Sequence, residues 1–213
     1  MSIEVFDYRA DLRNVYVSPK LRGRFLRHEP GEVGPFHSHD IGDELFLILE
    51  GQCEFEIDGE RAVLGPGQLC VARAGQKHEV RVIGDEPMIM FLVVAPHIEP
   101  THTLWDADGK QRPAQYNLTT ADQYDRANDA GSVTDLAQTV STALSQLASD
   151  VALAAKTFGN QIGALAAGGT IAKAALDESW LTFLTMHEQL FAFQEAWNLL
   201  AGRVFEEYRA IES

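Results

Sequence analysis

The pattern of hydrophobic and polar residues changes near residue 116. Before this point, short apolar segments are separated by glycine-containing turns, which is typical of β-strands. After it, apolar residues recur every three or four positions through long stretches rich in Ala, Leu and Gln, which is typical of helices. We therefore predict a mainly β fold with an α extension, in which residues 1–115 form the β region and residues 116–213 the helical region.

The clearest strand prediction is a hairpin. Residues 52–57 alternate apolar and polar side chains, so one face of this strand should enter a core and the other should face water. Asp58-Gly59 follows, and this dipeptide readily adopts the positive φ angles of a type I′ turn. Residues 60–64 then form the return strand.

Two further segments, 45–49 and 88–94, are apolar at every position, which predicts strands covered on both faces. Short strands with glycine-rich turns and no intervening helices favour an antiparallel sandwich or barrel over a parallel sheet.

The second region predicts an antiparallel hairpin of two long helices. Ser132 and Asp135 have the spacing of a capping box, which predicts a helix start. The apolar stripe of this helix continues to the region of Gly159, which is placed to act as a C-terminal cap. A second helix is predicted from Asp177, a plausible N-cap, to about Tyr208.

Charge and composition narrow the function classes. The chain has 17 basic and 31 acidic side chains, a formal net charge of -14, which disfavours binding to nucleic acid or to anionic membranes. The longest apolar run of the first half is far shorter than the roughly 20 residues that span a bilayer. Because the N-terminus lacks a signal-peptide pattern, we expect a cytoplasmic protein. Cys53 and Cys70 lie in strand-like segments and are expected to be buried free thiols.

Candidate metal ligands lie in the β region. His37 and His39 are two residues apart on an extended segment, so their imidazoles point to the same face. Glu44 follows at the head of an apolar strand and adds a carboxylate suited to a divalent cation. His78 comes after a turn predicted at residues 73–75 and can project inward from a separate strand. These four residues are the predicted metal ligands.

The spacing of these residues resembles the cupin superfamily. Its first motif is written G-x5-H-x-H-x4-E-x6-G, and every fixed position is present: Gly31, His37, His39, Glu44 and Gly51. Its second motif is written G-x5-P-x-G-x2-H-x3-N, and it matches at Gly67, Gly75 and His78. The departures are Arg73 in place of proline and Val82 in place of asparagine.

The resemblance covers roughly residues 20–96. It implies a small single-barrel cupin, a jelly roll of about six to eight strands with one divalent ion held by the three histidines and the glutamate. Mn, Fe, Zn and Ni are the candidate ions. The open coordination positions of such a site imply an enzyme acting on a small oxygenated molecule, as a dioxygenase or as an isomerase, epimerase or lyase. The alternatives are a non-catalytic module that binds or senses a small molecule or metal, and a barrel whose histidines are structural.

Other histidines give weaker predictions. His28 is expected at an exposed strand end, with the barrel mouth as the alternative. His97 and His102 fall in the connection after the last long strand and are expected to be solvated. His187 lies among apolar residues of the second helix and is expected to be packed there.

Substrate contacts are less specific. The main basic concentration is expected to form surface salt bridges, with one or two members contacting an anionic substrate as the alternative: Arg22, Arg24, Arg27 and Arg81. Selectivity is expected from residues flanking Phe46, Ile48, Val80 and Phe91.

The helical region shows no family resemblance and is assigned no chemistry. Its second helix carries many aromatic residues, more apolar surface than a hairpin can bury alone. We predict a homodimer to which the helices contribute, with the outer face of the barrel as the alternative cover.

Overall fold

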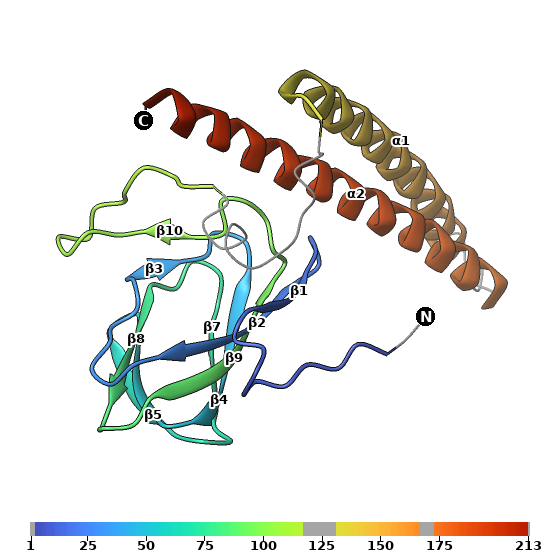
Figure 1. Ribbon diagram of the computed structural model, residues 1–213. Coiled ribbons are helices and arrows are strands. Elements are labelled where there is room, and N and C mark those ends of the chain that lie inside the picture. Colours follow the sequence, from blue (N-terminus) through green and yellow to red (C-terminus); the bar gives the residue numbers. More distant parts are fainter. Residues whose placement is uncertain (1–2, 117–130, 167–172, 213) are drawn as a thin grey trace. The chain divides into compact units, whose positions relative to one another are not determined.

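The computed structural model describes residues 3–116, 131–166 and 173–212. The chain divides into two compact units, one of Met1–Ala127 with Phe205–Ser213 and the other of Asn128–Val204. All strands of the described residues belong to the first unit, and the second contains α1 and most of α2 (Figure 1). The predicted domain boundary at residue 116 stays a prediction.

The β unit is a jelly roll of two antiparallel five-stranded sheets, which confirms the predicted fold class. The first sheet has the order β1 (Asn14–Val17), β2 (Arg22–His28), β9 (Met88–Ala95), β4 (Asp43–Glu50) and β7 (Leu69–Ala72). The second has the order β10 (Thr103–Leu104), β3 (His37–Ser38), β8 (His78–Ile83), β5 (Gln52–Ile57) and β6 (Glu60–Leu64). The described residues thus form ten strands, and the excess over the predicted number comes from short ones such as β3 and β10.

The predicted hairpin is confirmed. β5 and β6 pair antiparallel from Cys53 opposite Leu64 to Ile57 opposite Glu60. The turn residues Asp58 and Gly59 have φ angles of 49° and 83°, as a type I′ turn requires.

Gly51 shows why a motif glycine is needed between β4 and β5. Its φ is +72°, and a Cβ atom there would lie 2.3 Å from the carbonyl oxygen of Pro87. A side chain cannot fit at this distance, so glycine lets β4 turn into β5 beside the start of β9.

The core lies between the two sheets and is built from alternating positions. Phe46 and Ile48 of β4 point into it, whereas Leu45, Leu47 and Leu49 on the other face are only partly buried. The prediction that both faces of residues 45–49 are covered is therefore too strong, because β4 alternates like a strand with one core face. β9 fits its prediction better, because Ile89 on its other face is buried as well.

The two cysteines of the core are free thiols. Cys53 is fully buried and Cys70 partly buried, and burial raises the pKa of each thiol to about 12.

The helical unit begins with the predicted capping box. The Asp135 N–H donates to Ser132 Oγ at 3.2 Å, and the Ser132 N–H donates to the Asp135 carboxylate at 3.3 Å. Helix α1 (Val133–Ala166) starts directly after this cap. Near its other end, Gln161 Nε2 donates to the carbonyl of Ala175 at 2.9 Å, which ties α1 to α2 (Lys173–Glu212).

Two predicted helix ends are wrong. α1 continues past Gly159, because an interior glycine costs a helix only about 1 kcal/mol and does not by itself end it. α2 begins before Asp177, whose carboxylate pairs with Lys173 Nζ at 2.7 Å along the helix instead of capping it. His187 is partly buried between Phe183 and Phe191, with ring centroids 4.2 and 6.2 Å away. No helix among the described residues is long and apolar enough to cross a membrane.

Candidate metal centre

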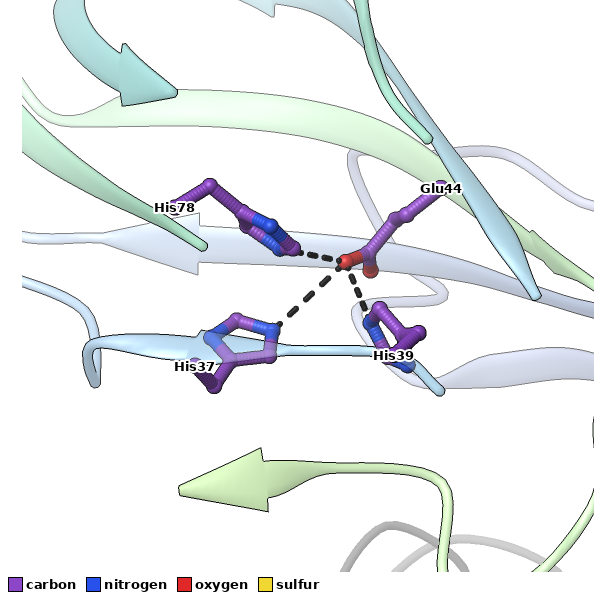
Figure 2. A group of neighbouring side chains, drawn as sticks. All are labelled: His37, His39, Glu44 and His78. Carbon is purple, nitrogen blue, oxygen red and sulfur yellow. Dashed lines mark hydrogen bonds and ion pairs between the residues drawn. The ribbon is translucent and has the colours of Figure 1, made fainter. Parts of the chain in front are cut away.

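The four predicted ligands come together between the sheets. β3 pairs with β8 so that His37 lies opposite His78, and His39 follows directly after β3. Glu44 is the second residue of β4, in the other sheet. Figure 2 shows the three imidazoles surrounding one carboxylate. The ligand atoms of the four residues all lie within 4.8 Å of one another.

The turn before His78 is fixed to the segments that carry the other ligands. Gly75, with φ +82°, donates its N–H to the carbonyl of His39 at 2.7 Å. Ala74 donates its N–H to Asp43 Oδ1 at 2.8 Å. Arg73, which replaces the usual proline, donates its own N–H to Gln76 Oε1 at 2.9 Å, a bond that proline lacks the hydrogen to make. The predicted turn is thus confirmed. The N–H that Arg73 has in place of the motif's proline forms a hydrogen bond within this turn.

The centre is closely packed and largely removed from water. Glu44 Oε2 lies 2.7 Å from His39 Nε2, 3.1 Å from His78 Nε2 and 3.6 Å from His37 Nε2. The side chains of Glu44, His39 and His78 are at most 3% exposed, and that of His37 is 12% exposed.

Backbone carbonyls orient all three imidazoles. Nδ1 of His37 faces the carbonyl oxygen of Pro35 at 2.8 Å, and Nδ1 of His78 faces that of Gln76 at 2.9 Å. Nδ1 of His39 faces the carbonyl oxygen of Thr101. Because a carbonyl oxygen only accepts, each Nδ1 carries the proton, and in the neutral ring the lone pair of Nε2 points at Glu44.

In this arrangement three hydrogen-bond acceptors, the Nε2 atoms of the imidazoles, face another acceptor, the carboxylate of Glu44. His37 Nε2 is buried and has no hydrogen-bond partner. Unprotonated imidazole nitrogens facing a carboxylate repel it, and leaving buried polar atoms unpaired is costly. A divalent cation satisfies all four groups at once, and a backbone carbonyl that accepts from Nδ1 is the usual support of a metal-bound histidine. The residues therefore fit a metal ion.

The electrostatics give the protonation states that a metal requires. Burial alone would raise the pKa of Glu44, but the surrounding imidazoles of His37, His39 and His78 hold it well below its usual range. Burial lowers the pKa of His37, and the neighbouring Glu44 offsets this only in part. Glu44 is thus an anion and His37 a neutral ligand at neutral pH.

A cavity of about 340 Å³ adjoins the centre. Its wall is mostly apolar. The residues that line it include Arg22, Arg24, Leu26, His28, His37, Glu44, Phe46, Phe55, His78, Val80, Met90, Leu92 and His102.

His102 is a site residue that sequence reasoning placed wrongly. Its ring centroid lies 4.7 Å from that of His37 and 4.8 Å from that of His39, and it lines the cavity. Burial, together with the nearby His37 and Arg22, lowers the pKa of His102 well below its usual range. The cause is the two-residue strand β10, which sets Thr103 opposite Ser38 of β3. No local pattern could reveal so short a pairing.

His97 and His28 also differ from their predictions. His97 is 1% exposed, with Nδ1 3.0 Å from Thr101 Oγ1, so it is a buried structural residue and not a solvated one. His28 lines the cavity, with Nδ1 2.8 Å from Glu32 Oε1. The alternative position at the barrel mouth is the one observed, because the end of β2 borders the cavity.

The arginines separate into two pairs. Arg22 and Arg24 line the cavity, whereas Arg27 is exposed and paired with Glu29 at 2.9 Å, and Arg81 is exposed. Of the residues that flank the four apolar positions named above, Met90 and Leu92 on either side of Phe91 line the cavity, as do Phe46 and Val80 themselves. Ile48 is part of the core, and Phe91 packs against Phe25 with ring centroids 5.1 Å apart.

Comparisons with known proteins agree with the motifs. Residues 24–94 match the family model described as Cupin domain. Over 79 residues, 37% of this chain, the sequence is 30% identical to a Streptomyces cyaneus protein named polyketide synthase CurC. The match spans 51% of that relative, about half its length.

Solved structures are similar over part of the chain. One is a Klebsiella pneumoniae protein with a double-stranded β-helix domain, at 23% identity and a TM-score of 0.46, covering 49% of this chain and 99% of that one. Another is the TT1209 protein of Thermus thermophilus, at 27% identity and a TM-score of 0.42, covering 44% of this chain and 98% of that one. Both motifs, from Gly31 to Gly51 and from Gly67 to Val82, lie within residues 24–94, so this part of the chain is a cupin domain.

Proposed function

We propose that this chain binds one divalent transition-metal ion and uses it as an enzyme acting on a small oxygenated organic molecule. The ligands are Nε2 of His37, His39 and His78 and the carboxylate of Glu44. One observation carries the proposal: three backbone carbonyls turn three imidazole nitrogens toward a single buried carboxylate.

The chain's own residues supply the conditions for chemistry. Four protein ligands leave one or two coordination positions of a five- or six-coordinate ion open, and the cavity borders this centre. When bound, the ion would act as a Lewis acid or redox centre for a coordinated oxygen group. The apolar wall, including Leu26, Val80 and Leu92, excludes water and receives the carbon skeleton of the substrate.

The reaction classes are dioxygenation for an Fe, Mn or Ni ion, and isomerisation, epimerisation or elimination for Zn or Mn. The name of the Streptomyces cyaneus relative supports an oxygen-rich substrate, because polyketides carry carbonyl and hydroxyl groups that can ligate a metal.

A second candidate is a non-catalytic sensor. The feature that favours it is the separate helical unit, which exposes Trp180, Leu181 and Leu176 and could transmit ligand occupancy to a partner. Turnover of a metal-dependent substrate distinguishes the two, since a sensor would bind the molecule unchanged.

The experiment that tests the proposal is elemental analysis of the purified protein by mass spectrometry. We expect close to one transition-metal ion per chain and near-complete loss in the double variant His37→Ala, His39→Ala, because two of four ligands are gone. His97→Ala is the matched control, a buried histidine outside the cluster, and should keep the metal. Full metal content in the double variant would show that the ligands are assigned wrongly.

A further inference from the structure

A buried arginine next to the metal centre has hydrogen-bond donors without a partner. Arg22, the first residue of β2, is 2% exposed and lines the cavity. Its Nη2 lies 3.9 Å from Glu44 Oε1, too far for a hydrogen bond. Its Nε and Nη1 are buried and have no hydrogen-bond partner. Leaving charged donors buried and unpaired costs a protein stability, and an anion bound in the cavity would offset this cost.

A role in holding the Glu44 carboxylate does not explain the position of the Arg22 guanidinium. An arginine that holds a carboxylate normally does so with two parallel bonds, as Arg27 of the same strand does with Glu29 at 2.9 and 3.4 Å. Glu44 Oε2 instead faces the three imidazoles, and the Arg22 guanidinium lies too far from Oε1 for a hydrogen bond. Nε and Nη1 lie on different edges of the guanidinium, and Nη2, too far from Glu44 for a hydrogen bond, completes a donor pair with either of them for a planar anion in the cavity.

We propose that Arg22 binds the carboxylate of the substrate, which identifies the substrate class as small carboxylic acids. This inference rests on the proposed function of the neighbouring metal centre and names its substrate. A carboxylate matches the fork of a guanidinium, and a second oxygen, such as a 2-hydroxyl or 2-oxo group, would lie toward the ion. The apolar wall then contacts the rest of the acid. The charges agree: Arg22 balances Glu44, so a divalent ion leaves the cavity positive within a chain of net charge -14.

Calorimetric titration of the metal-loaded full chain with mandelate and with mandelamide tests this proposal. The two probes have nearly the same shape, but only mandelate is an anion. We expect the wild type to prefer mandelate, and Arg22→Met to bind it about tenfold to a hundredfold more weakly, the range for hydrogen bonds to charged groups. Mandelamide should bind both proteins alike. Arg27→Met, which removes an exposed arginine of the same strand, should match the wild type.

Equal affinity of Arg22→Met and wild type for mandelate would overturn the proposal. So would loss of the metal from Arg22→Met, measured on the same samples, since the guanidinium would then serve Glu44. If that variant fails to fold, the wild type decides alone: no preference for mandelate over mandelamide contradicts a carboxylate site. A wild type without metal refutes the proposed function instead, and the mandelate preference of the metal-free protein still tests Arg22.

Discussion

Glu44, His39 and His78 of the β unit are 2% exposed, whereas Trp180 and Leu181 of the helical unit are 56% and 64% exposed. The first unit buries charged and polar groups, and the second leaves large apolar ones on its surface. Two facing sheets can enclose side chains from both sides and fix them through backbone carbonyls, which a pair of helices does not do here. We therefore propose that the β unit carries the chemistry and that the helical unit contacts other surfaces.

The largest expected effect is the difference between two matched leucine truncations. Leu64 is 5% exposed in the β core and Leu181 is 64% exposed on α2. Leu64→Ala should lower the free energy of unfolding by about 2–5 kcal/mol because it leaves a cavity, and Leu181→Ala by at most about 0.5 kcal/mol. Urea denaturation followed by circular dichroism measures both. Similar losses would mean that the exposed face of α2 is covered in solution.

That outcome would favour the predicted homodimer, which stays a prediction. Light scattering of the wild type and of Leu181→Glu would then show whether a second copy is the cover.

A smaller effect is expected from acid. The folded-state pKa values of His37 and His102 lie below those of the unfolded chain, so between the two values the unfolded chain binds more protons. The stability of the metal-free protein should therefore be complete above about pH 6.5 and fall below it, by up to about 1.4 kcal/mol per pH unit for each imidazole. Denaturation of chelator-treated protein between about pH 7.5 and 5.5 measures the slope.

His102→Leu supplies the control for this prediction. It should flatten the pH slope because one buried imidazole is gone, while the carboxylate of Glu44 titrates at lower pH. An unchanged slope would contradict the claim that His102 contributes to the loss of stability in acid.

The smallest effect lies at the start of α1. Ser132→Ala removes the side-chain acceptor of the Asp135 N–H and should destabilise the helix by about 1 kcal/mol. Ser141→Ala, an exposed change within the same helix, should have no such cost. Thermal unfolding monitored at a helical wavelength compares the two, and equal midpoints would argue against the capping box.

The features that sequence predicted well are those with local causes. The Asp58-Gly59 turn and the Ser132 cap each depend on residues within a few positions of one another. The cupin motifs made the four clustered residues predictable as well, because the spacing of a motif determines which strand carries each of its residues. Helix ends failed at Gly159 and Asp177, since neither residue compels a helix to stop or start.

The features that sequence missed depend on contacts between distant segments. His102 joins the centre only because the two residues of β10 pair with β3. Arg22 and Arg27 lie five positions apart on β2 and therefore on opposite faces, but which face meets the interior depends on how the sheets pack. Neither fact is encoded in a local pattern.

Anomalous diffraction at the absorption edge of the metal found by elemental analysis tests the central claim most directly. We predict one peak, within about 2.0–2.2 Å of Nε2 of the three histidines and of an oxygen of Glu44. A peak at any other position, or none in metal-loaded crystals, would contradict the assignment of His37, His39, Glu44 and His78 as the metal centre.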